Sequence, residues 1–281
     1  MSRPFVFALC LLVLATAPAS AAPPCTPGGP QALRVRMVAP SISGTVFVVD
    51  GPHCRYLRFG SPFGIDQSTI SLADRDAIPT EYVRLAALGL ALASRTERIL
   101  MVGLGGGTFT NLARRVRPDV EIDAVELDPV VVEAATRFFG VLPSPHLRVH
   151  VADAAEFLAR SERRFDLVFL DTYGVDGMAA HLATEAYFDS AIRRLRPGGV
   201  VVANFGVAEP MEYVALARRL RAAAGDALCL SGREEANLVV FAGSSETLRG
   251  GDLATRAAQF DLEGRLPFRL GDLAGRVRDC L

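Results

Sequence analysis

Short apolar runs alternate with helix-like segments along most of the chain. The runs are rich in Val, Ile, Leu and Phe, which is typical of parallel strands that are buried on both faces. We expect strands at 98–102, 120–125, 147–151, 165–170, 199–205, 227–230 and 237–242. The intervening segments predict helices at 79–94, 109–116, 130–139, 155–159, 185–195 and 212–224. This alternation predicts an α/β fold with a doubly wound, mostly parallel sheet that carries helices on both faces.

Two regions depart from this alternation. Residues 33–59 are strand-like, with a β-rich run at 44–51 and an alternating run at 56–60, and they predict a small antiparallel sheet ahead of the main one. The last two strands of the main sheet are separated only by the polar residues 231–236, which predicts an antiparallel hairpin at its edge. We expect an irregular or helical tail from about residue 250 to residue 281.

The N-terminus has the pattern of a secretory signal peptide. Arg3 precedes an apolar run at 4–17, and small residues follow with an A-x-A pattern at Ala19 and Ala21. The run is shorter than the roughly 20 apolar residues of a membrane span, and an uncleaved anchor is the alternative. We therefore expect an exported protein, periplasmic or secreted, with no membrane span after cleavage.

These patterns divide the chain into four parts. A signal peptide covers 1–22, a linker and small β-domain cover 23–78, the α/β domain covers 79–245 and the tail covers 246–281. The chain has 30 basic residues, all of them Arg, and 31 acidic residues. A nucleic-acid partner is therefore not expected, because it would require a basic excess or a basic stripe.

Cleavage of the signal peptide would remove Cys10 and leave four cysteines. Four cysteines allow three connectivities, and an exported protein can form disulfides. From their order along the chain we expect the pairs Cys25–Cys54 and Cys229–Cys280, with four unpaired thiols as the alternative. There is no C-x-x-C spacing and the four His residues are scattered, so no metal site is expected.

The candidate chemistry begins with a glycine-rich loop between the first strand and the first helix of the parallel sheet. Gly103, Gly105 and Gly107 let the backbone approach a ligand closely, and the helix start offers unpaired N–H groups. Glu126 ends the next strand, where a carboxylate can accept hydrogen bonds from ribose hydroxyls. Loop and acid together indicate a nucleoside site, although a G-x-G loop alone is weak evidence.

Two further acids follow strand ends. Asp153, with Ala154, follows the third strand, where it could accept from an adenine amine or act as a helix N-cap. Asp171 ends the fourth strand and could hold a cationic amine or take its proton, or be purely structural. Tyr173 could line the same pocket or simply pack.

Together these motifs resemble the spermidine/spermine synthase family, the polyamine aminopropyltransferases. The resemblance rests on 103–107, 125–128, 151–154 and 165–171, and the upstream segment 57–82 is similar to the family's N-terminal β-domain and the segment after it. It implies a Rossmann-like methyltransferase fold with a seven-stranded sheet. It also implies that decarboxylated S-adenosylmethionine donates an aminopropyl group to an amine, with no metal, and a homodimer is a candidate assembly.

The resemblance also implies roles for individual residues. Gln67 and the glycine loop would bind the donor, Glu126 the ribose and Asp153 the adenine, while Asp171 would act as the base. Tyr82 and Tyr173 are the candidates for substrate binding.

Two positions depart from the family pattern. Gly106 stands where the family usually has an acid in the loop, and Gly174 stands where it has a second Asp, with Asp176 nearby but out of register. The donor site therefore looks intact and the amine site altered. Two alternatives stay open: a methyltransferase that uses S-adenosylmethionine, and an exported, non-catalytic nucleoside-binding homologue.

Overall fold

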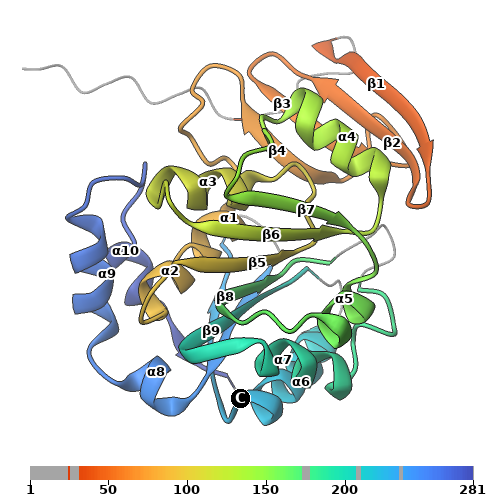
Figure 1. Ribbon diagram of the computed structural model, residues 1–281. Coiled ribbons are helices and arrows are strands. Elements are labelled where there is room, and N and C mark those ends of the chain that lie inside the picture. Colours follow the sequence, from red (N-terminus) through yellow and green to blue (C-terminus); the bar gives the residue numbers. More distant parts are fainter. Residues whose placement is uncertain (1–24, 26–31, 173–177, 207–209, 234–236, 281) are drawn as a thin grey trace, which may run out of the picture.

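The computed structural model describes residue 25 and residues 32–172, 178–206, 210–233 and 237–280. A small antiparallel sheet in the order β1-β2-β3-β4 lies beside a larger, eight-stranded sheet (Figure 1). The small sheet consists of β1 (Arg34–Ser41), β2 (Gly44–Asp50), β3 (Cys54–Phe59) and β4 (Asp66–Ser71). The expected N-terminal antiparallel sheet is thus present, and it extends further along the chain than the pattern indicated.

The main sheet has the order β12-β10-β11-β9-β8-β5-β6-β7. Its strands from β5 to β9 run parallel, while β10, β11 and β12 join as antiparallel strands at one edge. The doubly wound, mostly parallel sheet is confirmed, with one short strand more than the seven expected. The strands are β5 (Arg98–Val102), β6 (Glu121–Glu126), β7 (Leu147–Val151), β8 (Phe165–Leu170), β9 (Leu195–Phe205), β10 (Asp226–Ser231), β11 (Leu238–Gly243) and β12 (Arg278–Asp279).

Helices cover both faces of the main sheet, and the strands have apolar side chains on both sides. Within β5, Ile99 and Met101 belong to one buried cluster, whereas Leu100 and Val102 belong to another. This is the period of two that a strand imposes on its side chains. The helices are α1 (Glu81–Ala86), α2 (Gly89–Leu92), α3 (Thr108–Val116), α4 (Pro129–Phe138), α5 (Ala154–Arg160), α6 (Glu185–Arg193), α7 (Pro210–Ala224), α8 (Ser245–Arg249), α9 (Leu253–Asp261) and α10 (Gly271–Ala274).

Two elements differ from the sequence prediction. The helix expected over 79–94 is divided into α1 and α2, and α2 begins at Gly89, where a Cβ would lie 2.4 Å from the Val202 side chain. This close approach to β9 fixes the path of the chain there. β4 was not predicted because its sequence is polar, yet it pairs with β3. The tail, expected to be irregular or helical, is largely helical: it forms α8, α9, α10 and the short strand β12.

Both expected disulfides are present. Cys25 is bonded to Cys54, which ties the described N-terminal residue to β3. Cys229 of β10 is bonded to Cys280, which fastens the end of the tail to the edge of the main sheet. The segment 1–22, assigned to a signal peptide, lies outside the described residues.

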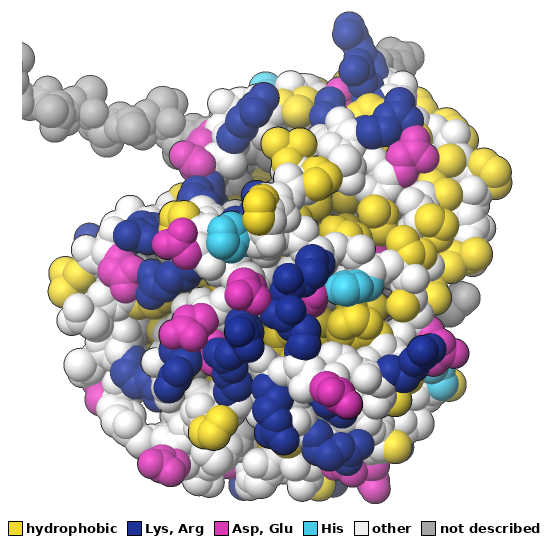
Figure 2. Space-filling view, viewed as in Figure 1, with side chains coloured by type: hydrophobic (Ala, Val, Ile, Leu, Met, Phe, Trp, Pro, Cys, Tyr) yellow, Lys and Arg dark blue, Asp and Glu magenta, His cyan; other side chains and the backbone are white. Residues whose placement is uncertain are grey.

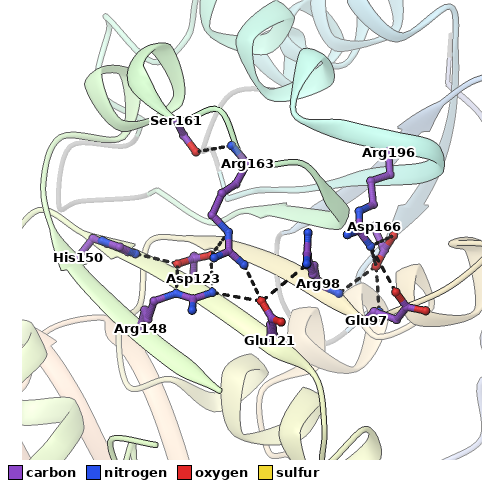
Figure 3. Close-up of polar contacts among 10 residues, drawn as sticks. All are labelled: Glu97, Arg98, Glu121, Asp123, Arg148, His150, Ser161, Arg163, Asp166 and Arg196. Atoms are coloured by element: carbon purple, nitrogen blue, oxygen red, sulfur yellow. Dashed lines mark hydrogen bonds and ion pairs between the residues drawn. The ribbon is translucent and has the colours of Figure 1, made fainter. Parts of the chain in front are cut away.

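A polar network fills one side of the main sheet near β6 and β7 (Figure 3). The Asp123 carboxylate is 1% exposed, and it accepts hydrogen bonds from Arg148 at 2.9 Å and His150 at 2.8 Å. Arg163 lies 3.2 Å from the second oxygen of Asp123 and also donates to Glu121. Because a buried carboxylate needs such partners, these contacts satisfy Asp123 and join β6 to β7.

The surface is uneven in chemistry (Figure 2). Arginines are spread over the lower part of the viewed face, whereas hydrophobic side chains gather at the upper right, where Figure 1 draws β1 and β2. Val35, Val38 and Ile42 of this N-terminal region are exposed. Within the described ranges, no helix is long and apolar enough to cross a membrane.

Candidate active site

The candidate site lies at the carboxyl ends of β5 and β8. These neighbouring parallel strands pair Val102 with Leu170, so the chain leaves both at the same edge of the sheet. The next parallel strand after β5 is β6 on one side, and the next after β8 is β9 on the other side. Ligands of open α/β sheets bind at such a reversal of strand order, because the connections diverge and leave a crevice.

The glycine loop closes directly over this point. Gly103, Gly105 and Gly107 have φ angles of 85°, 51° and 68°, in the region that favours glycine. A Cβ on Gly103 would lie 2.0 Å from the backbone oxygen of Asp171, and one on Gly107 would lie 2.2 Å from Val141. The three glycines are therefore required by the backbone itself, and they bring the loop against the residue proposed as the base.

Gly106 is glycine for a different reason. Its φ is not positive, but a Cβ there would lie 2.8 Å from the Ser68 Cβ and 3.0 Å from the Phe139 ring. The Gly106 N–H donates a hydrogen bond of 2.8 Å to the Ser68 hydroxyl. Ser68, from β4 of the small sheet, thus occupies the space into which an acid at this loop position would begin to extend.

Glu126 holds the other side of the loop. One oxygen of its carboxylate accepts hydrogen bonds from the N–H groups of Leu104 at 2.9 Å and Gly105 at 3.2 Å, and the other accepts from Asp128 at 3.1 Å. Burial raises the pKa of the Glu126 carboxyl, and these three bonds offset that effect only in part. The side chain that was predicted to bind ribose therefore also fixes the loop, and its second oxygen keeps acceptor capacity for a hydroxyl.

Asp153 has the N-cap role that the sequence offered as one of two compatible readings, and its hydrogen bond to an adenine amine stays a prediction. It is the N-cap of α5, where one carboxylate oxygen accepts from the Glu156 N–H at 3.0 Å. The other oxygen lies 2.9 Å from Nε2 of His181. Burial acts to raise the pKa of Asp153, but the bonds from Glu156 and His181 outweigh it, and the pKa lies below its usual value. Ala154 is the first residue of α5.

Asp171 is held from the neighbouring strand. Its N–H donates to the Val102 carbonyl at 2.8 Å, which continues the β5–β8 pairing. Its carboxylate accepts a hydrogen bond of 2.9 Å from the side-chain amide of Asn204, which is 4% exposed at the end of β9. The Asn204 oxygen in turn accepts from the Asn237 amide at 2.8 Å. The proposed base is thus part of a short polar chain across β8, β9 and the start of β11.

For the other predicted binding residues, the structure gives less evidence of a place in the site. The backbone oxygen of Gln67 would lie 4.0 Å from a Cβ on Gly105, so this residue lies beside the loop. Tyr82 is half-buried on α1 and packs against the main core. Tyr173, Gly174 and Asp176 lie outside the described residues.

Four side chains of this region were not singled out from the sequence: Ser68, His181, Asn204 and Asn237. Asn204 follows an apolar run at a strand end, which is the same signal that identified Asp171. The other three had no comparable signal, because their partners are far away along the chain. Leu127 and Val151, which are 52% and 55% exposed, add apolar surface at this edge that could cover a base ring.

Known proteins of one family are similar to this part of the chain. The family model for the spermine/spermidine synthase domain matches residues 81–217. A polyamine aminopropyltransferase of Vibrio vulnificus is 36% identical over 126 residues, which is 44% of this chain and 42% of that protein. A polyamine aminopropyltransferase of Chromobacterium violaceum is 27% identical over 249 residues, which is 86% of this chain and 94% of that protein. Both names denote transferases. The match with the first relative spans less than half of its length.

Solved structures show the same architecture. A probable spermidine synthase from Corynebacterium glutamicum aligns with a TM-score of 0.67 and 19% identity, over 88% of this chain and 90% of that one. Human methyltransferase-like protein 13, in complex with SAH, aligns with a TM-score of 0.60 and 23% identity, over 67% of this chain and 94% of that one. At these identities the likeness concerns the fold. Residues 81–217 therefore match the spermine/spermidine synthase domain, and the chain has the doubly wound fold of these solved structures.

Proposed function

We propose that this protein transfers an aminopropyl group from decarboxylated S-adenosylmethionine to a small amine. One observation carries the proposal: the glycine loop lies against the backbone of Asp171 at the point where the strand order reverses. The reacting carbon of a donor held by the loop and Glu126 would then lie close to a carboxylate. Such proximity is the main requirement of a displacement whose leaving group is already activated.

The chemistry needs one proton transfer and one displacement. Asp171 takes a proton from the acceptor ammonium, which frees the lone pair of its nitrogen. That nitrogen attacks the propyl carbon bonded to the sulfonium, the C–S bond breaks and its electron pair stays on sulfur. The products are methylthioadenosine and the extended amine, so no further reactant is required.

The acceptor site is expected to be weaker than in a polyamine synthase with two further acids. The positively charged end of the aminopropyl group would meet Gly106 and Ser68 rather than a loop carboxylate. Each lost charge-assisted contact weakens binding by about 1.5–3 kcal/mol. A second departure bears on the acceptor itself: Gly174 stands where the resemblance implies an Asp that helps hold the polyamine. We therefore propose an acceptor with few positive charges, with polyamine biosynthesis as one process of this class.

The same feature favours a second candidate, a methyltransferase that uses intact S-adenosylmethionine. With no acid at position 106, the carboxylate of S-adenosylmethionine would meet no like charge in the loop. The Ser68 hydroxyl lies at this position of the loop, hydrogen-bonded to the Gly106 N–H. The likeness to a methyltransferase bound to SAH is in keeping with this reading. The two candidates differ in the product: methylthioadenosine for one and S-adenosylhomocysteine for the other.

We further propose that the protein is exported. The N-terminal pattern supports this, and two disulfides are typical of an oxidising compartment. Mass spectrometry of the protein isolated from its cells would give the mature N-terminus. An N-terminus at or near residue 23 is the expected result, and an intact Met1 in the cytoplasmic fraction would contradict it.

Turnover with both donors tests the main proposal. Purified protein is incubated with each donor and a series of mono- and diamines, and the nucleoside product is identified by chromatography. We expect methylthioadenosine from the decarboxylated donor and its loss in Asp171→Asn. Asp119→Asn is the matched control, because Asp119 is an exposed turn residue ahead of β6. If neither donor reacts while nucleoside binding is intact, the homologue is a non-catalytic binding protein.

A further inference from the structure

Three side chains form a hydrogen-bonded row across the end of the main sheet. The amide of Asn237 donates to the Asn204 oxygen at 2.8 Å, and the amide of Asn204 donates to Oδ1 of Asp171 at 2.9 Å. The strand register creates this row: Leu170 pairs with Ala203 in parallel, and Leu238 pairs with Phe205 in antiparallel fashion. One step beyond the first pair, Asp171 lies beside Asn204. One step beyond the second pair, Asn237 lies opposite Gly206, and its side chain reaches diagonally to Asn204.

The row can have only one polarity when Asp171 is ionised. A carboxylate is an acceptor only, so Asn204 must turn its NH₂ group toward it. The Asn204 oxygen then faces the opposite way and needs a donor, because this side chain is 4% exposed and an unpaired buried oxygen is unfavourable. Asn237 supplies that donor. The orientation of both amides is thus set by the charge on Asp171, and they in turn stabilise that charge.

We propose that Asn204 and Asn237 are positioning residues that hold the Asp171 carboxylate ionised and in one rotation. The proposal rests on the proposed function, in which Asp171 takes the proton of the acceptor amine. A fixed Oδ1 defines the direction in which the second oxygen meets the amine. A donor held at 2.9 Å also favours the charged form, which is the form able to accept a proton.

Replacing the hydrogen-bond donor at position 237 by an acceptor distinguishes a positioning role of Asn237 from a packing role. Asn237→Asp has nearly the same shape but can only accept, so Asn204 must turn its NH₂ group to it and present its oxygen to Asp171. We expect kcat to fall about 10- to 100-fold, the usual loss for one charge-assisted hydrogen bond. Asn237→Ala should be milder, because water can donate in place of the missing amide. The KM for the donor should change less than about twofold in both variants.

Two readouts complete the test. The acidic limb of the pH–rate profile should move to higher pH in Asn237→Asp, because Oδ1 of Asp171 loses the hydrogen bond from Asn204. Gln259→Glu, an equivalent change of amide to acid on the exposed side of α9, should leave kcat and the profile unchanged. A purely structural role predicts the reverse order, with Asn237→Ala more harmful than the isosteric Asp. That order, or an unchanged pH profile, would overturn the proposal.

Carboxyl NMR makes the test independent of turnover. The titration of Asp171, assigned by comparison with Asp171→Asn, is followed in the wild type and in Asn237→Asp. A titration midpoint at higher pH in the variant supports the proposal that Asn204 and Asn237 stabilise the ionised Asp171 carboxylate. This result would stand even if no acceptor amine is turned over and the proposed reaction is wrong. An unchanged midpoint overturns it, whatever the activity.

Discussion

The Ser68 hydroxyl accepts a hydrogen bond from the Gly106 N–H, and its Cβ lies 2.8 Å from the place where a side chain on Gly106 would begin. Ser68 belongs to β4 of the small sheet and Gly106 to the loop between β5 and α3, so a side chain from the N-terminal region fills the space at the position where the loop acid is missing. The altered donor loop is thus a packed feature of this protein and is not the simple loss of one carboxylate.

Restoring the acid should therefore be unfavourable. Gly106→Asp is expected to destabilise the protein by about 1–3 kcal/mol, because it places a Cβ against both Ser68 and Phe139. Urea unfolding measures this loss. Adding Ser68→Gly should recover part of it, and the double-mutant cycle should give a favourable coupling energy. Additive effects of the two substitutions would contradict the packing explanation.

Gly103 should be far more sensitive than its φ angle alone would require. Gly103→Ala combines a φ of +85° with a Cβ only 2.0 Å from the Asp171 backbone oxygen. We expect a loss of more than about 3 kcal/mol in stability, together with a loss of turnover as Asp171 is displaced. Gly225→Ala is the control: its φ is +91°, but no atom lies within 4 Å of the added Cβ. It should show only the backbone strain of about 1–2 kcal/mol.

Glu126 should control nucleoside binding and its dependence on pH. The amide of Glu126→Gln has one oxygen, so it cannot accept hydrogen bonds at both positions where the carboxylate oxygens accept them. We therefore expect methylthioadenosine to bind about 10- to 100-fold more weakly. Because burial raises the pKa of Glu126, the wild-type affinity should begin to fall at a pH above the ordinary range for Glu. Calorimetry from about pH 8 to about pH 5 tests this. Identical pH dependence in the Gln variant would argue against the assignment.

Asp226 provides a pH-dependent contribution to stability at the edge of the main sheet. Its carboxylate is 4% exposed, and the hydrogen bond from Arg249 lowers its pKa from 3.8 to about 2. Because the pKa of Asp226 is lower in the folded than in the unfolded protein, its ionised carboxylate stabilises the fold at every pH above the unfolded-state pKa. This stabilisation is therefore present above about pH 4 and is lost as the pH falls toward 2. Asp226→Asn should lose about 2 kcal/mol at neutral pH and converge with the wild type in acid. Asp279→Asn, at an exposed partner of Arg249, should change stability by less than about 1 kcal/mol.

The Cys229–Cys280 disulfide should hold the tail in place. The double substitution to Ser is expected to reduce the free energy of unfolding by about 2–4 kcal/mol, because it releases a chain segment with a sequence separation of 51 residues. Unfolding in urea with and without a reductant is the measurement. The reductant should lower the free energy of unfolding of the wild type toward that of the variant. Any further decrease in the variant itself reports the Cys25–Cys54 disulfide. Equal stability of the oxidised wild type and the variant would show that β12 is held by its other contacts.

The sequence by itself determined the layered architecture. Apolar runs alternating with helical segments specify buried parallel strands, because helices cover both faces of such a sheet and remove most of its side chains from water. The same pattern located the strand ends, and with them Glu126, Asp153 and Asp171. The glycines of the loop were also predictable, since their positions between a strand and a helix demand close approach of the backbone. The order of the cysteines along the chain suggested two pairs among three possible connectivities, and the structure selected them.

Only the tertiary structure decided which distant residues meet. Ser68 reaches Gly106 because the small sheet lies against the loop, and Asn237 reaches Asn204 because of the register between β9 and β11. The break between α1 and α2 depends on contact with β9, and β4 forms a strand from polar residues because β3 offers a pairing edge. Such features arise from contacts between segments far apart in sequence. The local pattern of apolar and polar residues indicates burial and secondary structure. It does not indicate which distant residue a given side chain will contact.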